Sequence, residues 1–240
     1  MSPFTLLDPA VRLADAIVVA VSHILTWPGG GASVVAGVVI VTVLARAALL
    51  PLAVRALRAE RARAALRPEL ARVRERWGAD RARLAEETAQ VYRRAGVSPV
   101  AGLGPALAQL PVLATLYRVV VVPTVGGHAN AVVSASVLGG PLSAHWLVLL
   151  AAAGPASAAG AGFAVVLVLL LATAWVSGSQ AAARAAQPGS TGSTASARIS
   201  RLLPFATVAF AVLSPVGVGF YLVVSTAWTA AERAVLPRLA

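Results

Sequence analysis

Residues 32–54 read ASVVAGVVIVTVLARAALLPLAV, an apolar run of membrane-spanning length that holds a single charge, Arg46. About 20 apolar residues in a helix cross the hydrocarbon core of a bilayer. An arginine near the middle of such a helix costs roughly 2.5–3.5 kcal/mol on insertion. The stretch therefore predicts a transmembrane helix whose arginine needs either a structural or a functional explanation.

Two explanations for Arg46 are open at this point. In the first, the side chain snorkels to the membrane interface or pairs with Glu232, the one acid expected within another span. In the second, it lines a water-filled cavity that opens to the cytoplasm. Arg46 lies roughly 12 Å from the end of the run at Val54, at the rise of an α-helix. That distance is long for snorkelling and favours the cavity.

The composition supports the membrane assignment and excludes several kinds of chemistry. The 240 residues are 58% hydrophobic and 12% charged, whereas soluble domains are usually about 25% charged. No cysteine is present, which excludes disulfides and thiolate sites in this sequence. The three histidines are not at metal-ligand spacing. We expect no enzyme activity, no metal, no cofactor and no small-molecule substrate.

Residues 55–100 form a strongly basic segment with twelve arginines and six acids. Apolar residues recur at helical spacing on both sides of Gly78. Pro68 suits the first turn of one helix and Asp80 suits the N-cap of the next. We therefore predict a cytoplasmic antiparallel helical hairpin. The residues expected to contact partner proteins or anionic lipid lie around its turn: Arg72, Arg74, Arg76, Trp77, Arg81 and Arg83.

Four more apolar stretches bring the expected number of spans to five: 103–122, 158–177, 202–213 and 216–236. Pro105 and Pro111 loosen the second span, so neighbouring helices must satisfy the freed carbonyls. Residues 1–31 contain an amphipathic helix, expected over 10–27 at the outer membrane surface. The other segments are an extracytoplasmic loop at 123–157, a polar cytoplasmic linker at 178–200, and a short tail at 237–240. The sequence leaves open whether 142–153 within that loop is a re-entrant or interfacial piece.

The distribution of arginine predicts the orientation, because cytoplasmic loops carry an excess of positive charge. If the first span exits into the cytoplasm, that side holds the twelve arginines of the hairpin, three around the linker and two near the C-terminus. If residues 11–27 also spanned the membrane, the hairpin would face outward. We predict an all-α integral membrane protein with five transmembrane helices, its N-terminus outside and its C-terminus inside.

Four segments in this order resemble the YidC/Oxa/Alb membrane protein insertases. They are the span with Arg46, the basic hairpin, GLGPALAQLPVLATLYR at 102–118 and LLPFATVAFAVLSPVGVGFYLVVSTAWTAAERAVL at 202–236. The resemblance covers about residues 28–236 and suits a short bacterial form without a large extracytoplasmic domain. It implies five helices around a hydrophilic groove that is open to the cytoplasm and to lipid but closed on the outer side.

The resemblance also implies which residues and partners take part. The groove would be lined by Arg46, Gln109, Ser177, Tyr221 and Trp228. Tyr221-Leu222 stands where members often have a tyrosine–tryptophan pair, and Ser177 where they often have glutamine. The protein would insert nascent membrane proteins into the bacterial inner membrane as a monomer, among anionic lipids. The sequence leaves open whether the Sec translocon and the ribosome take part.

The alternative function is that of a small polytopic transporter or channel. Such a protein predicts several polar residues that face each other across spans, and usually paired repeats. Neither feature is evident in the sequence. Transport assays in liposomes separate this alternative from an insertase.

Overall fold

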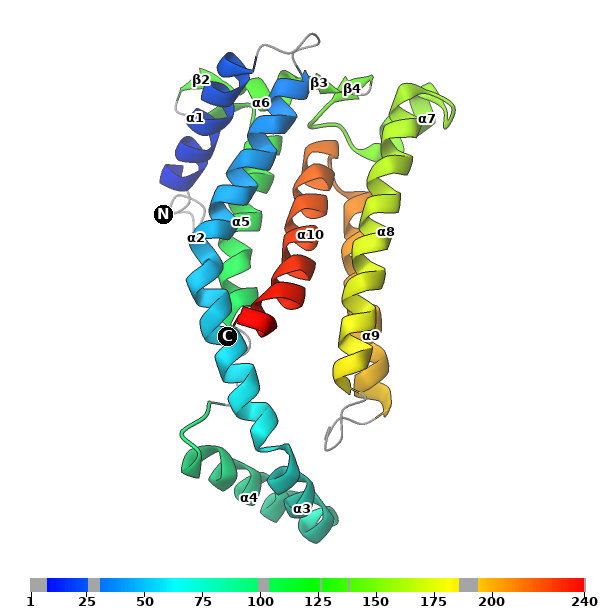
Figure 1. The fold of residues 1–240 in the computed structure, drawn as a ribbon. Coiled ribbons are helices and arrows are strands. Elements are labelled where there is room, and N and C mark those ends of the chain that lie inside the picture. Colours follow the sequence, from blue (N-terminus) through cyan, green and yellow to red (C-terminus); the bar gives the residue numbers. More distant parts are fainter. Residues whose placement is uncertain are drawn as a thin grey trace.

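The structure is a computed structural model of the whole chain, and it describes residues 8–25, 31–98, 104–125, 127–137, 139–185 and 194–239. The described part is almost entirely helical, as expected. Five long helices form a bundle (Figure 1): α2 (Gly31–Ala65), α5 (Gly104–Val121), α8 (Ala158–Ala185), α9 (Thr194–Leu213) and α10 (Val216–Leu239).

Helix α10 is the central element of this bundle. It contacts α2 and α5 on one side and α8 and α9 on the other. Helices α8 and α9 also pack against each other along their length. Because α10 touches all four of the other long helices, any polar group on it has neighbours from several elements.

Helix α2 continues well beyond the apolar run that we expected to end at residue 54. It passes through Pro51 and ends only at Ala65. Residues 55–65 are mainly alanine, arginine and glutamate, which all favour helix. The boundary at residue 54 is therefore a change of polarity and not the end of a helix.

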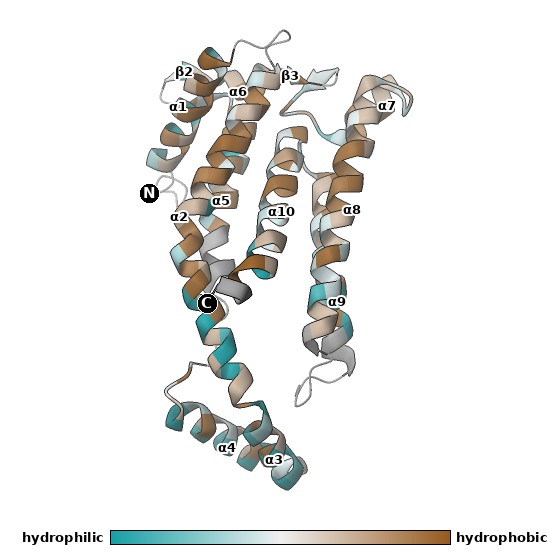
Figure 2. Cartoon of the chain, viewed as in Figure 1, coloured by the Kyte–Doolittle hydropathy of each residue, from teal (hydrophilic) through white to brown (hydrophobic). Residues whose placement is uncertain are grey.

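The basic segment that follows contains two helices, α3 (Arg67–Trp77) and α4 (Arg81–Arg94), which contact each other. Pro68 lies in the first turn of α3, as predicted. The Asp80 carboxylate accepts hydrogen bonds from the backbone N–H groups of Ala82 and Arg83, both at 3.1 Å. Its predicted role as N-cap is thereby confirmed. Figure 2 shows this pair as the hydrophilic end of an otherwise largely apolar molecule.

The segment between α5 and α8 covers the opposite end of the bundle, where α1 packs along the side of α2 and α5. We expected that segment, 123–157, to be a loop, but it is largely folded. Its elements are two antiparallel strand pairs and two short helices: β1 (Thr124–Val125) with β2 (His128–Ala129), β3 (Ser136–Val137) with β4 (Gly140–Pro141), α6 (Ala131–Ser134) and α7 (Trp146–Ala153).

The hydrogen bonds of Asn130 are one physical reason why the segment 123–157 is folded. Its buried side-chain amide donates to the carbonyls of Val119 and Val122 at 2.6 and 2.7 Å, and its oxygen accepts from the N–H of Val132 at 2.9 Å. These bonds satisfy backbone groups at the end of α5 and at the start of α6. In the sequence, a single asparagine within an apolar stretch does not indicate that the segment is folded around it.

The amphipathic helix expected over 10–27 is α1 (Asp8–Ile24). Its side chains Val11, Ala14 and Val18 are buried in the protein, and α1 contacts both α2 and α5. Gly37 of α2 makes close contact possible, because a Cβ there would lie 2.9 Å from the Cα of Val18. One apolar face of α1 is therefore covered by protein.

The linker predicted at 178–200 is helical wherever the structure describes it. Helix α8 continues to Ala185 and α9 begins at Thr194, while residues 186–193 lie outside the described part. Alanine fills most of 181–186, and its high helix propensity extends α8 past the end of the apolar run. The prediction of a linker rests on the polarity of this segment, whereas its alanine content favours a helix.

Along α2, buried residues are concentrated in the half of the helix away from the hairpin. Every buried residue of α2 lies between Gly31 and Thr42. Trp146 and Leu142 are almost completely buried at the same end, beside the first turns of α10. A Cβ at Gly217 would lie 2.9 Å from the Val120 side chain, so α10 and α5 meet closely there. This end of the molecule is therefore closed by side-chain packing.

Two described helices are long and apolar enough to cross a membrane, Gly31–Ala65 and Ala158–Ala183. Two shorter apolar helices, Leu110–Val121 and Arg201–Leu213, lie beside them. The structure thus supports an all-helical protein with at least two membrane-spanning candidates.

We predict that Gly37→Val destabilises the protein, because the added side chain overlaps Val18 of α1. Overpacking of this kind costs about 1–3 kcal/mol. The midpoint temperature of unfolding in detergent measures the effect. Ala32→Val, at an exposed position of the same helix, is the control and should leave the midpoint almost unchanged. Equal midpoints for the two variants would contradict the close contact.

We also predict that Asp80→Ala loosens the start of α4. Loss of an N-cap costs about 1 kcal/mol, which corresponds to roughly fivefold faster hydrogen exchange at the first amides of α4. Glu75→Ala, an exposed acid on α3, is the matched control for charge. Unchanged exchange in Asp80→Ala would show that the cap does not hold the helix end.

Candidate functional site: a polar strip along the central helix

The candidate site is built around the contact between Arg46 of α2 and Ser225 of α10. The Nη2 atom of Arg46 donates to the Ser225 carbonyl oxygen at 2.8 Å and also to the Ser225 hydroxyl, which accepts a further bond from Nε at 3.2 Å. Ser225 itself is buried. The arginine of the first apolar helix is therefore bound to the central helix, 179 residues further along the chain.

The partners of Arg46 at this contact are neutral oxygens, so its positive charge is not cancelled there. Glu232, the acid considered as a possible ion-pair partner, lies within electrostatic range of Arg46. Its carboxylate instead accepts a hydrogen bond from Nε1 of Trp228 at 2.6 Å, and it forms no ion pair with Arg46 in the described part of the chain. A cation held only by neutral acceptors can still attract an anion that approaches it.

Helix α8 faces α10 from the other side with polar side chains of its own. The hydroxyls of Thr173 and Thr226 are 3.1 Å apart. The Gln180 amide donates to the carbonyl of Ala230 at 3.4 Å. Ser177 is buried and lies one helical turn after Thr173, between these two contacts. Together with the Arg46–Ser225 contact, these side chains form what we call the polar strip, which lies along α10 between α2 and α8. Its members are Arg46, Thr173, Ser177, Gln180, Ser225 and Thr226.

The structure places the five residues predicted to line the groove in different parts of the bundle. The structure brings Arg46 of α2 within electrostatic range of Tyr221 of α10, which is buried, while Trp228 lies on α10 and bonds to Glu232. Ser177 lies on the α8 side of the strip. The side chain of Gln109 is outside the described part of the structure. The role of these residues as a groove lining stays a prediction.

Ser225 is the residue that sequence reasoning missed, along with the Thr173–Thr226 and Gln180 contacts. A signal for it was present. Tyr221, Ser225, Trp228 and Glu232 follow one another at spacings of four, three and four residues, which places them on one face of a helix. The Ser225 hydroxyl was overlooked because a serine in an apolar helix usually bonds to its own backbone.

The strip begins at the level where the burial of α2 ends. Arg46 lies one turn after Thr42, the last buried residue of α2. Beyond that point toward the hairpin, all described residues of α2 are half-buried or exposed. The charge thus lies at the border between the buried part of α2 and its more accessible part.

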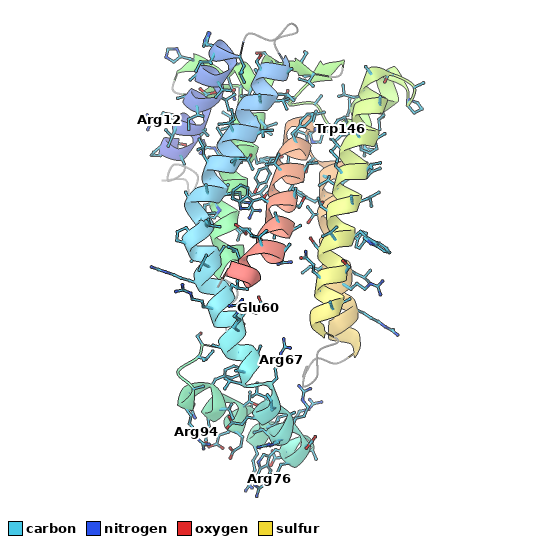
Figure 3. The ribbon with its side chains drawn as sticks, viewed as in Figure 1. Arg12, Glu60, Arg67, Arg76, Arg94 and Trp146 are labelled. Carbon is cyan, nitrogen blue, oxygen red and sulfur yellow. The ribbon has the colours of Figure 1, made fainter. Side chains whose placement is uncertain are left out.

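The hairpin presents a separate basic surface. The arginines expected to make contacts there, Arg72, Arg74, Arg76, Arg81 and Arg83, are all exposed. Trp77 is half-buried, with the Arg83 guanidinium 4.8 Å and the Arg76 guanidinium 5.5 Å from its ring centre. These cation–π contacts hold three side chains together near the turn. Figure 3 shows Arg76 and Arg94 extending outward from the hairpin.

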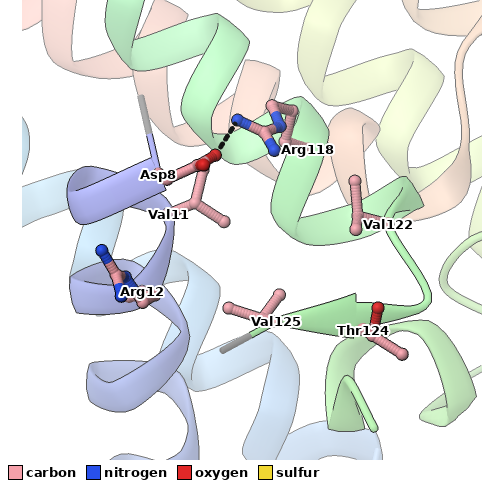
Figure 4. Close-up of a pocket in the computed structure, with 7 residues that line it drawn as sticks. All are labelled: Asp8, Val11, Arg12, Arg118, Val122, Thr124 and Val125. Atoms are coloured by element: carbon pink, nitrogen blue, oxygen red, sulfur yellow. Dashed lines mark hydrogen bonds and ion pairs between the residues drawn. The ribbon is translucent and has the colours of Figure 1, made fainter. Parts of the chain in front are cut away.

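A third group of charges joins α1 to α5. Arg118 donates from Nη1 to Oδ1 of Asp8 at 2.7 Å, across a pocket of about 260 Å³ that Arg12 also lines (Figure 4). This ion pair explains the second arginine expected within a span, since Arg118 has a carboxylate partner. Arg46 differs from it in having neutral partners.

The described residues contain no group of three His, Asp or Glu side chains that could hold a metal ion. The site therefore consists of a cation, hydroxyls and amides within an apolar helical bundle. These features define a helical membrane protein with a charged polar strip inside it.

The comparison with protein families is consistent with that class. A model of the 60Kd inner membrane protein family matches residues 28–240, and the chain belongs to this family. The match covers most of the chain and confirms the resemblance to the YidC/Oxa/Alb insertases.

Curated relatives carry the name of insertase. The chain is 37% identical over 87 residues to membrane protein insertase YidC 1 of Halalkalibacterium halodurans, which covers 35% of this chain and 34% of that protein. It is 37% identical over 82 residues to the insertase YidC of Streptomyces avermitilis, at 34% and 19% coverage. ALBINO3-like protein 1, chloroplastic, of Arabidopsis thaliana is 37% identical over 81 residues, at 34% and 16% coverage. The matches thus span about a third of these relatives or less.

We predict that Ser225→Ala destabilises the protein by about 1.5–3 kcal/mol, the usual effect of losing a hydrogen bond to a charged group. The same substitution should have little effect when Arg46→Leu is already present, because no guanidinium is then left to satisfy. Unfolding midpoints of the four proteins of this cycle measure the coupling. The control is Ser179→Ala. Ser179 is an exposed residue of α8, and its hydroxyl donates to the carbonyl of Val176 in the same helix. Equal losses in both backgrounds would contradict the contact.

Proposed function

We propose that the protein is a membrane protein insertase, which receives hydrophobic segments of nascent membrane proteins and releases them laterally into the bilayer. The observation that carries the proposal is that the Arg46 guanidinium donates to neutral oxygens of Ser225 at the level where the burial of α2 ends. The family and the names of the relatives support the same function. No covalent step is required, since the task is to move a polar segment across an apolar layer.

The proposed arrangement places α2, α5, α8, α9 and α10 across the bacterial inner membrane, with the hairpin in the cytoplasm. The excess of arginine on the hairpin side supports this orientation. In it, the end closed by α1, α7 and the strand pairs faces outward. The polar strip then faces the cytoplasm and forms the floor of a hydrophilic groove.

The mechanism follows from the length of the apolar path that a polar segment of the substrate has to cross. The hydrocarbon layer is about 30 Å thick. The closely packed part of α2, from Gly31 to Thr42, spans only roughly 17 Å at helical rise. A polar segment that reaches Arg46 from the cytoplasm would therefore have to cross only about half of the layer without polar contacts.

The charge of Arg46 supplies the attraction for such a segment. Two unit charges about 4 Å apart interact by roughly 4 kcal/mol at an effective dielectric constant near 20. The insertion of one Asp into a membrane helix costs about 2.5–3.5 kcal/mol. The attraction thus offsets the cost of one acidic residue without trapping it. Burial of the apolar part of the substrate in lipid would then favour release.

We propose that the hairpin captures substrates or docks partner proteins through its exposed arginines. Its first helix is joined to α2 through Leu66, a single non-helical residue, so that the hairpin continues directly from α2. The net positive charge suits anionic lipid headgroups and acidic protein segments. The protein would work as a monomer, because the strip is built from helices of one chain.

We predict that Arg46→Glu abolishes insertion of a small substrate with an acidic translocated segment, that Arg46→Ala reduces it strongly and that Arg46→Lys retains part of it. Protease protection of the substrate in proteoliposomes measures insertion. Lysine keeps the charge but loses the forked geometry that binds Ser225, which explains the intermediate result.

Arg118→Gln is the matched control for this series, because Arg118 is also an arginine in an apolar helix but is paired with Asp8. It should leave insertion close to the unmodified level. Full insertion with Arg46→Glu, at unchanged protein folding, would refute the attraction of acidic segments by Arg46.

A further inference from the structure

A cleft lies between α8 and α9 at the end of the bundle nearer the hairpin. Its volume is about 400 Å³, and Trp175 and Ser179 of α8 line it together with Arg198, Arg201 and Phe205 of α9. Helices α8 and α9 cross closely beneath it, since a Cβ at Gly178 would lie 2.9 Å from the carbonyl oxygen of Arg201. The cleft is therefore a shaped depression between two helices and not a gap between loose segments.

This cleft faces away from the polar strip. Thr173 and Gln180 of α8 contact α10. Trp175 is two residues after Thr173, which places it about 200° around the helix on the opposite face. Its side chain is 66% exposed. In a membrane protein such a face of α8 lies against lipid.

The charge of the cleft is positive and is not balanced by its own helices. Arg198 and Arg201 are three residues apart and both exposed, and therefore neighbours on one face of α9. Helices α8 and α9 contain no aspartate and no glutamate. Neither arginine has an ion-pair partner within the described residues. Paired guanidinium groups of this kind bind phosphate oxygens well.

The cleft also combines this charge with an apolar surface in the order that a phospholipid requires. The arginines lie within the first two turns of α9, near the end of the bundle. Leu202, 63% exposed, and Phe205 follow on α9 toward the bundle centre, beside Trp175. Tryptophan prefers the membrane interface. Basic pockets between transmembrane helices on the cytoplasmic side are known binding sites for anionic lipid headgroups.

We propose that the α8–α9 cleft binds one anionic phospholipid, with its phosphate on Arg198 and Arg201 and an acyl chain along Trp175 and Leu202. The site requires α8 and α9 to lie in a bilayer, but it does not depend on the role of Arg46. A bound lipid would join the two helices on the side away from α10. It would thereby hold the far wall of the bundle in place while the strip side stays accessible.

Quenching of Trp175 fluorescence by phospholipids with brominated acyl chains tests the proposal in proteoliposomes of the whole protein. The Trp175 contribution is the difference between the unmodified protein and Trp175→Phe. Brominated phosphatidylglycerol should quench it more strongly than brominated phosphatidylcholine. This comparison leaves both arginines of the cleft unchanged, and equal quenching by the two lipids overturns the proposal.

Arg198→Ala with Arg201→Ala should lower the preference for phosphatidylglycerol by roughly tenfold or more. Arg198→Lys with Arg201→Lys should keep a large part of it. Arg93→Ala with Arg94→Ala, two exposed arginines at the end of the hairpin, makes the same change in charge and should leave the preference unaltered. A preference that survives the alanine pair at the cleft overturns the proposal.

A competition experiment distinguishes binding of a lipid headgroup from binding of a free anion. Inorganic phosphate at constant ionic strength should not displace brominated phosphatidylglycerol, because the acyl chain contributes to binding. Displacement by phosphate would show that the cleft is only an anion site and would overturn the assignment to lipid. Insertion assays on Arg46 variants are independent of these results, so the two proposals fail separately.

Discussion

The bond between Arg46 and Ser225 is the constraint on which the arrangement of the bundle depends. A guanidinium within an apolar helix has to find polar partners, because an unsatisfied buried charge is costly. Ser225 provides two oxygens at the correct height on α10. This contact fixes the position of α10 relative to α2 and so brings the central helix to the arginine. Helices α8 and α9 then pack on the remaining sides of α10.

The contact also separates the molecule into two halves with different physical properties. On one side of it, glycines at 37 and 217 allow helices to approach closely, and large side chains such as Trp146 close the end. On the other side, α2 is half-exposed and continues into a basic hairpin. A protein that moves polar segments part of the way into a membrane needs such an asymmetry, with one end sealed and the other accessible.

The choice of neutral partners distinguishes Arg46 from Arg118. Arg118 is paired with Asp8, and the pair joins α1 to α5 with little net charge. At Arg46 the oxygens of Ser225 accept hydrogen bonds from Nε and Nη2 but carry no formal charge. Glu232 is close enough to influence the arginine but is bonded to Trp228. The two arginines, similar in the sequence, therefore differ in their partners, a carboxylate for Arg118 and neutral oxygens for Arg46.

The sequence by itself determined the helical class, the apolar runs, the charge asymmetry and the local signals of the hairpin, such as Pro68 and Asp80. These features depend on neighbouring residues and on hydrophobicity, which are readable along the chain. Only the tertiary structure decided that Ser225 binds Arg46, that 123–157 is folded around Asn130 and that α8 and α9 form a cleft with two arginines. Those features join residues that are distant in the chain, and polarity alone does not indicate which distant partner a side chain will reach.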